Sequence, residues 1–268
     1  MTACVKALGE NIGTFQIVFF RGLFTFIFTY VILKQKNIYI WGNNHEILIS
    51  RGIIGTIALF LVYESILRFT LAEATLIQYL YPLFISILSV FFLSEKFSKS
   101  IVLSILFGLV GVYIVLNFPF INYQNSFNFI NLAIAISGSF LTGLAYILVK
   151  MASERNESPY VIMFYFPLFT VPLSFFLMQG TWQWPNSKEW ILLLLVGFFS
   201  QFGQIFLTHG YKNLPASNAA ITSFAQVPFA ILIGVLVFSE GIYLNHSIGS
   251  IIIFISIILV ITRKNRVA

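Results

Sequence analysis

Residues 63–117 read YESILRFTLAEATLIQYLYPLFISILSVFFLSEKFSKSIVLSILFGLVGVYIVLN, which is two apolar spans joined by the short charged link SEKFSKS. A weaker copy over residues 208–262 reads THGYKNLPASNAAITSFAQVPFAILIGVLVFSEGIYLNHSIGSIIIFISIILVIT. At offsets of 144 to 146 residues, the copies align Ala72 with Ala216, Pro82 with Pro228, and Ser94-Glu95 with Ser239-Glu240. An internal repeat constrains the architecture more than any single motif does. The sequence therefore predicts two related halves.

The amino-acid composition is that of an integral membrane protein. Hydrophobic residues make up 59% of the chain and charged residues 9%, with a mean hydropathy of +0.92, whereas a soluble domain carries about 25% charged residues. So few charges cannot cover a water-facing surface. The chain contains no Asp, a single cysteine (Cys4) and three histidines without HExxH spacing. We therefore expect no metal, no cofactor and no intramolecular disulfide.

Nine stretches are long and apolar enough to cross a bilayer as helices, for which roughly 20 residues suffice. They are residues 15–33, 47–69, 72–93, 101–117, 129–151, 159–178, 189–210, 217–238 and 246–262. Residues 1–9 are too short to cross alone and are interpreted as the end of a first helix, whose start is either missing or upstream of Met1. The predicted fold class is all-α, with about ten transmembrane helices of which the first is partial.

The distribution of lysine and arginine along the chain predicts how the protein is oriented in the membrane. If the first helix starts inside, the inner segments and span ends carry eleven of these residues, and the outer side carries only Arg68 and Lys188. The positive-inside rule then places both termini in the cytoplasm. The net charge of +6 is therefore interpreted as membrane orientation, with no nucleic-acid partner. Because each half holds five helices, an odd number, residues 1–117 and 129–262 are predicted to form two inverted repeats.

Three stretches resemble the EamA-type transporters of the drug/metabolite transporter superfamily: FQIVFFRGLF at 15–24, LAEATLIQYLYPLFISILSVFFLSEK at 71–96 and GLVGVYIVL at 108–116. Residues 215–261 resemble the second module of that family. The resemblance implies ten helices, a substrate path between the halves and export by alternating access. The chain departs from the family pattern because most of the first helix is missing and because Glu240 is followed by Gly241.

Ionisable residues within a membrane cost about 2.5–3.5 kcal/mol at its centre and mark functional sites. Arg21 is interpreted either as an anchor for an anionic substrate group or as a structural arginine that reaches the outer interface. Lys6 either lines a central cavity or lies near the outer surface. Glu64 has Arg68 at i+4, which favours an ion pair, with proton coupling as the alternative. Glu73 fits a helix-capping box, and its alternative is again proton coupling.

Two polar stripes lie at helical spacing, one made of Gln201, Gln204 and Thr208 and the other of Ser139, Thr142 and Tyr146. A polar face in lipid must meet a cavity or another helix. We therefore expect Gln201, Gln204 and Tyr146 either to bind substrate or to form interhelical hydrogen bonds.

Gln78 precedes Pro82 by one turn, and Gln226 lies two residues before Pro228. Proline removes a backbone donor and clashes with the carbonyl four residues back. Both spans are therefore expected to kink, and both glutamines to satisfy a freed backbone group or to contact substrate. Kinks at matching places would also provide hinges.

These features predict a secondary transporter of a bacterial inner membrane that exports a small metabolite or amino-acid-like solute by alternating access. The chain has no GxxxxGK[ST] loop to bind ATP phosphates, and we predict that it is not an enzyme. The alternatives are a membrane-embedded lipid-modifying enzyme and a non-transporting scaffold. The expected partners are a small-molecule substrate and the lipid bilayer. The choice between monomer and homodimer stays open. Small residues at 100, 104, 108 and 111 predict a close helix seam, either within the chain or between two copies.

Overall fold

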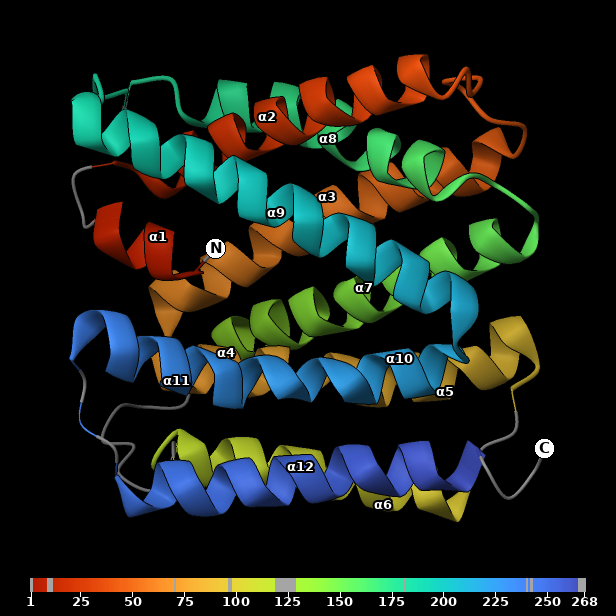
Figure 1. Cartoon of the computed structure of the whole chain (residues 1–268), viewed down its shortest axis with the longest axis vertical. Coiled ribbons are helices and arrows are strands. Elements are labelled where there is room, and N and C mark those ends of the chain that lie inside the picture. The colour runs from red at the N-terminus through yellow and green to blue at the C-terminus, as the bar shows by residue number, and fades with distance from the viewer. Residues whose placement is uncertain are drawn as a thin grey trace. The chain divides into compact units, whose positions relative to one another are not determined.

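The computed structural model describes residues 2–8, 12–69, 71–95, 98–118, 129–180, 182–239, 241 and 243–264. All secondary-structure elements in this part of the chain are helical (Figure 1). In chain order they are α1 (Thr2–Leu8), α2 (Thr14–Gln35), α3 (His45–Arg68), α4 (Leu71–Gln78), α5 (Tyr81–Leu93), α6 (Lys99–Val115), α7 (Phe129–Glu154), α8 (Pro159–Leu177), α9 (Ser187–Asn213), α10 (Ala216–Thr222), the three-ten turn η1 (Ser223–Ala225), α11 (Gln226–Phe238) and α12 (Leu244–Lys264).

Seven helical segments of the described chain are long and apolar enough to span a membrane. They are α2, α7, α8, α9, the part of α3 over His45–Ile66, and the two interrupted segments Ala74–Leu93 and Ala216–Val237. The expectation of ten spans is therefore wrong. The helix α6 has 17 residues, which at 1.5 Å per residue measure about 25 Å, less than the ~30 Å hydrocarbon core. The apolar part of α12 is similarly short. The chain is an integral membrane protein, and its described residues form seven helical segments of membrane length.

Local sequence sets where several helices begin. Ser98 precedes α6, and its hydroxyl accepts a hydrogen bond from the backbone N–H of Ile101 at 3.3 Å. Pro159 occupies the start of α8, where its missing N–H costs no helical hydrogen bond. Asn186 and Glu189 cap the start of α9 reciprocally, because each backbone N–H donates to the other side chain, at 2.7 and 2.9 Å.

The helices divide into two compact units, and each unit draws elements from both halves of the sequence. The first unit comprises Met1–Thr56 and Leu148–Asn213, and the second comprises Ile57–Ile147 and Leu214–Ala268. In the first unit, α2 packs against α8 and α9, and α1 packs against α9. Its buried apolar cluster consists of Leu8, Ile12, Ile17, Leu193 and Val196. The predicted repeats over 1–117 and 129–262 therefore describe the sequence and not these compact units.

In the second unit, α12 lies along α6 (Figure 1), and this is its most extensive helix pair. The two backbones approach closely at Gly111, where an added Cβ would lie 2.8 Å from the carbonyl oxygen of Gly249. The Ser256 hydroxyl also donates to the carbonyl of Ser104 at 2.6 Å. The predicted small-residue seam therefore forms within the chain, against α12.

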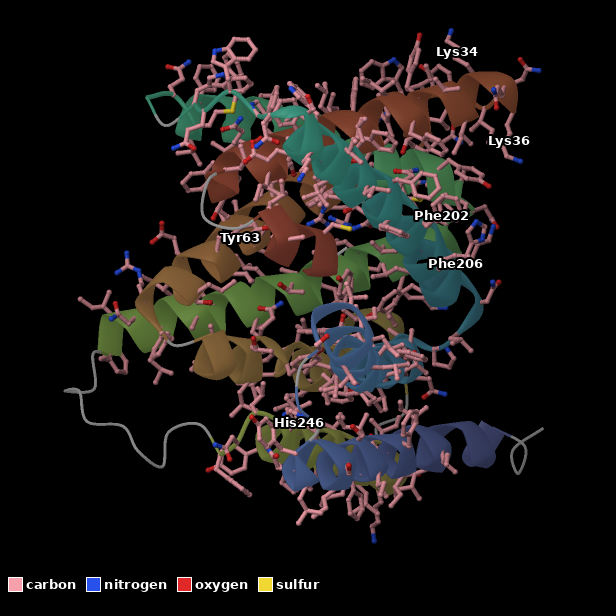
Figure 2. The ribbon with its side chains drawn as sticks, turned by 60° about the vertical axis from the view of Figure 1, so that its left-hand side comes forward. Lys34, Lys36, Tyr63, Phe202, Phe206 and His246 are labelled. Carbon is pink, nitrogen blue, oxygen red and sulfur yellow. The ribbon has the colours of Figure 1, made fainter. Side chains whose placement is uncertain are left out.

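Large apolar side chains remain exposed along the membrane-length helices. Phe206 of α9 is 72% exposed and Leu236 of α11 is 73% exposed. Figure 2 shows Phe206 beside Phe202 on α9. Exposed phenylalanine and leucine of this kind are unfavourable in water and favourable in contact with lipid chains.

Candidate functional site

Two membrane-length apolar segments of the second unit, Ala74–Leu93 and Ala216–Val237, change their helical geometry before a proline. The helix α4 ends at Gln78, and α5 begins two residues later at Tyr81, with Pro82 in its first turn. The helix α10 ends at Thr222, and the turn η1 separates it from α11, whose third residue is Pro228. Proline in the first turn of a helix is favourable, but proline cannot continue the preceding helix. The α-helical run thus ends before Pro82, where two turn residues separate α4 from α5, and it changes to a three-ten turn before Pro228.

At the interruption before Pro82, both the backbone carbonyl and the side-chain amide of Gln78 form hydrogen bonds with α7. Its carbonyl lies four residues before Pro82 and cannot accept the helical hydrogen bond that proline lacks. This carbonyl instead accepts a hydrogen bond from the Ser139 hydroxyl of α7 at 3.0 Å. The Gln78 side-chain amide donates to the Thr142 hydroxyl at 3.2 Å. The predicted polar stripe of α7 therefore faces another helix at this point.

Aromatic rings and hydroxyls join the two interruptions. The Tyr79 ring stacks on the Phe224 ring with centroids 5.7 Å apart, and the Tyr81 and Tyr146 rings meet edge to face at 5.6 Å. The Tyr81 hydroxyl forms a hydrogen bond with the Ser223 hydroxyl. The Gln226 side chain forms a hydrogen bond with Tyr79. We call Gln78, Tyr79, Tyr81, Tyr146, Ser223, Phe224 and Gln226 the interruption cluster.

The interruption cluster combines polar groups with aromatic faces. Its amide, hydroxyl and phenyl side chains are all uncharged at neutral pH. Tyr79, Tyr81 and Phe224 are buried, Gln78 and Tyr146 are half-buried, and Gln226 is exposed. Such a group can donate and accept hydrogen bonds, and its aromatic faces can attract an ammonium group.

Four of the predicted substrate-binding residues belong to the first unit. Gln201 is 1% exposed, and its amide donates to the Thr29 hydroxyl of α2 at 3.0 Å. This is the interhelical hydrogen bond that was the alternative to substrate contact. Arg21 of α2 and Gln204 of α9 are both half-buried. Lys6 belongs to α1, but its side chain lies outside the described residues.

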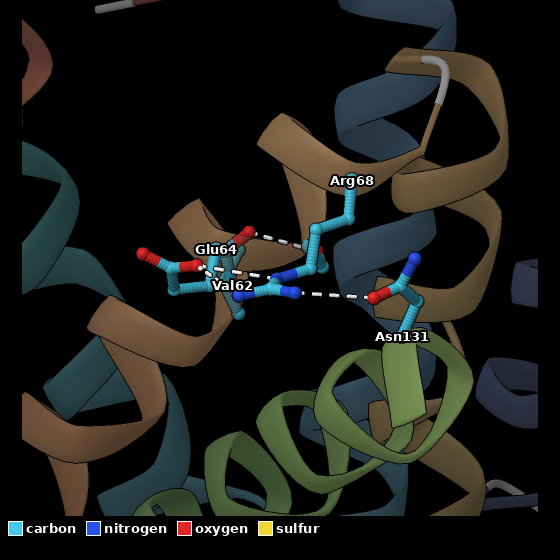
Figure 3. Close-up of polar contacts among 5 residues, drawn as sticks. Val62, Glu64, Arg68 and Asn131 are labelled. Atoms are coloured by element: carbon cyan, nitrogen blue, oxygen red, sulfur yellow. Dashed lines mark hydrogen bonds and ion pairs between the residues drawn. The ribbon is translucent and has the colours of Figure 1, made fainter. Parts of the chain in front are cut away.

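Glu64 and Arg68 form the predicted ion pair on α3. Figure 3 shows the Arg68 guanidinium reaching Glu64 at 3.0 Å and the side-chain oxygen of Asn131 at 3.1 Å. Both side chains are about two-fifths exposed, at 40% and 39%, so water weakens the pair. Glu73 lies in α4, and its side chain is outside the described residues.

Several polar groups were missed by reasoning from sequence, and Glu95 is the clearest. Its carboxylate accepts hydrogen bonds from the backbone N–H of Ala216 at 2.6 Å and from the Ser217 hydroxyl at 3.0 Å. The Ser217 hydroxyl lies 3.1 Å from that of Ser89 on α5. Glu95 thus fastens the end of α5 to the start of α10. The available signal was the alignment of Ala216 with Ala72, which marks a repeated helix start.

Arg51 was counted at a span end, and the structure places it inside α3. It is 4% exposed, and its guanidinium lies 5.0 Å from the centre of the Phe166 ring. Such cation–π contact holds a buried cation against an aromatic face. Tyr79, Tyr81 and Ser223 were also missed, and their only sequence signal was their position beside the two predicted kinks.

Comparison with known proteins identifies relatives over almost the whole chain. The pseudopaline exporter CntI of Pseudomonas aeruginosa is 27% identical over 241 residues, which cover 90% of this chain and 83% of the relative. An uncharacterized transporter of Helicobacter pylori strain J99 is 26% identical over 272 residues, with 97% and 89% covered. Solute carrier family 35 member G1 of Homo sapiens is 24% identical over 243 residues, with 86% and 67% covered.

A solved crystal structure and the profile of a protein family also match this chain. The crystal structure matches with a TM-score of 0.84 at 16% identity and covers 99% of this chain and 93% of its own, which shows a shared fold. The profile of the EamA-like transporter family matches residues 1–117 and 130–262. The resemblance expected from the sequence is confirmed. Since both parts of this match together span nearly the whole chain, the protein belongs to the EamA-like transporter family.

Proposed function

We propose that this transporter exports a small zwitterionic or neutral, amino-acid-like metabolite across a bacterial inner membrane by alternating access. In this proposal both termini are cytoplasmic, and residues 1–117 and 129–262 act as inverted repeats. The name of the Pseudomonas relative, an exporter, supports the outward direction. The energy source is an ion or solute gradient and not ATP.

The observation that carries the proposal is the interruption cluster. Interrupted helices at matching places of two repeats are where secondary transporters bind substrate, because free backbone groups and side chains there can face a cavity. Here the two interruptions lie before aligned prolines, Pro82 and Pro228, and side chains from both are hydrogen-bonded to one another. Gln78, Tyr146 and Gln226 remain the predicted substrate contacts within it.

The substrate class follows from the chemistry of the cluster. A multiply charged solute needs paired opposite charges when it leaves water, and the cluster offers none. Amide and hydroxyl groups can bind a carboxylate or carbonyl, and the rings of Tyr146 and Tyr79 can bind an ammonium group. Within the first unit, Arg21, Gln204 and Lys6 stay predicted substrate contacts, with Arg21 as the anchor for an anionic group, whereas the Gln201 amide bonds Thr29.

Alternating access requires one end of the substrate path to close while the other opens. We assign one closing contact to Glu95, which ties α5 to the first turn of α10 in the state described here. Charge-assisted hydrogen bonds of this kind contribute about 1.5–3 kcal/mol. That magnitude is large enough to hold one state and small enough to be released in each cycle.

Uptake into proteoliposomes tests the proposal. The purified full chain is reconstituted and supplied with a panel of labelled amino acids, other zwitterions, sugars and dicarboxylates, with and without a pH gradient. We expect saturable transport of a zwitterion, competition by related zwitterions, and a strong reduction when Gln78 is changed to Leu. Transport restricted to dicarboxylates, or equal transport by the Gln78→Leu variant, would contradict the proposed site. Lipid turnover without solute transport would instead support an embedded enzyme.

A further inference from the structure

The connection between α2 and α3 forms an open cavity at the end of a membrane-length helix. The cavity has a volume of about 470 Å³ and is lined by residues 33–34 and 37–41. Ile38 and Ile40 are half-buried and supply apolar surface, and Lys34 supplies a cation, whereas Leu33 is fully buried beneath them. Tyr39 is 66% exposed and Trp41 is 48% exposed. The lining therefore combines an aliphatic wall, an ammonium group and two large amphipathic rings.

The connection is held in place by contacts from α8 and from the turn before it. Glu157 is 3% exposed, and its carboxylate accepts hydrogen bonds from the backbone N–H groups of Asn43 and Asn44, both at 2.7 Å. The Tyr165 hydroxyl donates to the carbonyl of Trp41 at 2.9 Å. Gly42 has φ +64°, and an added Cβ there would lie 2.6 Å from the Glu157 carboxylate. The cavity is thus built before any ligand arrives.

One lysine, Lys34, lines this cavity, and a second, Lys36, lies at the C-terminal cap of the same helix. The Lys34 ammonium lies 5.8 Å from the centre of the Tyr30 ring, and the Lys36 ammonium lies 5.4 Å from that of Tyr160. Figure 2 shows both lysines at the same end of α2. Among the described residues that line the cavity, none is acidic. The nearby Glu157 carboxylate accepts hydrogen bonds from the backbone N–H groups of Asn43 and Asn44.

We propose that this cavity binds the phosphate headgroup of an anionic phospholipid. In this arrangement Lys34 and Lys36 face the phosphate, the rings of Tyr39 and Trp41 lie at headgroup depth, and the first acyl carbons lie against Ile38 and Ile40. Tyrosine and tryptophan favour this depth because one end of each side chain is apolar and the other is polar. A free phosphate ion would use the lysines but would gain nothing from the apolar wall. The combination therefore selects an amphiphile over a soluble anion.

Native mass spectrometry of the full chain tests the site. The protein is titrated with phosphatidylglycerol or phosphatidylcholine, and the bound copies are counted. A lysine near a membrane surface contributes an attraction that converts to about fivefold in affinity. We expect phosphatidylglycerol to bind more tightly than phosphatidylcholine, and the Lys34→Gln/Lys36→Gln variant to lose roughly 25-fold in affinity for phosphatidylglycerol only, by two such factors.

Two controls keep the result decisive. The Lys99→Gln/Lys188→Gln variant changes two lysines elsewhere in the chain and should bind phosphatidylglycerol as the unchanged protein does. The Lys34→Arg/Lys36→Arg variant keeps the charge and should retain most of the preference, which separates loss of charge from loss of folding. Inorganic phosphate at millimolar concentration should not displace the lipid. Displacement by phosphate, or full phosphatidylglycerol binding by the glutamine variant, overturns the proposal.

Discussion

Tyr146 illustrates at the residue scale how one side chain can serve packing and binding together. Its ring meets Tyr81 edge to face, and the residue is half-buried. Gln201 of α9 is instead fully buried, and its side-chain amide donates a hydrogen bond to the Thr29 hydroxyl. The two residues were predicted from the same kind of polar stripe. Helical spacing identifies a polar face, but it does not identify the partner of that face.

If Tyr146 binds an ammonium group, its ring matters more than its hydroxyl. We expect Tyr146→Leu to raise the KM for the transported zwitterion by about fivefold, the equivalent of a lost cation–π contact. Tyr146→Phe keeps the aromatic face and should change the KM much less. Initial rates of proteoliposome uptake measure both values. An equal effect of Leu and Phe would remove the aromatic face from the explanation.

We expect loss of the Glu64–Arg68 ion pair to have little effect on stability or on transport. Because both side chains are well exposed, Glu64→Gln should lower the free energy of unfolding by no more than about 1 kcal/mol. Transport driven by a pH gradient should continue. Thermal unfolding and gradient-driven uptake measure the two quantities, with Glu46→Gln, which changes an exposed carboxylate of the same helix, as the control. Loss of the gradient effect only in Glu64→Gln would assign proton coupling to this carboxylate.

At the scale of single elements, proline alone does not decide whether a helix breaks. The helix α8 contains Pro167 and Pro172 and continues without interruption from Pro159 to Leu177. The segments before Pro82 and Pro228 are interrupted instead. At Gln78 the freed carbonyl has an outside partner, the Ser139 hydroxyl, which stabilises the open backbone. For Pro82, therefore, the neighbouring helix supplies a hydrogen bond that the segment itself cannot make.

The interruption before Pro82 should act as a hinge. Pro82→Ala restores a backbone donor, and a hydrogen bond to Gln78 would favour the continuous helix by about 1 kcal/mol. We expect the transport rate to fall by about fivefold with substrate affinity largely retained. Pro172→Ala, within the continuous α8, is the matched control and should leave the rate unchanged. An unchanged rate in a well-expressed Pro82→Ala protein removes the hinge role.

At the scale of the whole molecule, the sequence halves and the compact units are different divisions of the chain. Each unit pairs helices from the first half with helices from the second, as α2 pairs with α8 and α6 with α12. Contacts within each compact unit therefore run between the two sequence halves. A transporter built in this way couples the two halves directly, because contacts such as that between Glu95 and Ala216 join residues that lie 121 positions apart.

Glu95 should therefore influence the balance between transport states. In a Cys4→Ser background, Ala216→Cys places a thiol at a fully buried position beside the Glu95 carboxylate. Glu95→Gln weakens the contact by about 1.5 kcal/mol and should raise maleimide labelling at position 216 by about tenfold. The exposed Glu46 provides a matched control through Glu46→Gln. Equal labelling in the presence and absence of Glu95→Gln would show that this contact does not hold a state.

The sequence by itself determined the membrane class, the family and most helix limits, because hydrophobic length, charge position and proline act locally along the chain. It also determined the Glu64–Arg68 pair, which one helical turn brings together. Only the tertiary structure decided that α6 and α12 form the small-residue seam, that Gln201 bonds Thr29, and that Tyr81 meets Ser223. Tyr81 and Ser223 are separated by 142 residues. A helical pattern records which face of a segment is polar or small, but the partner of that face is chosen by the packing of distant segments.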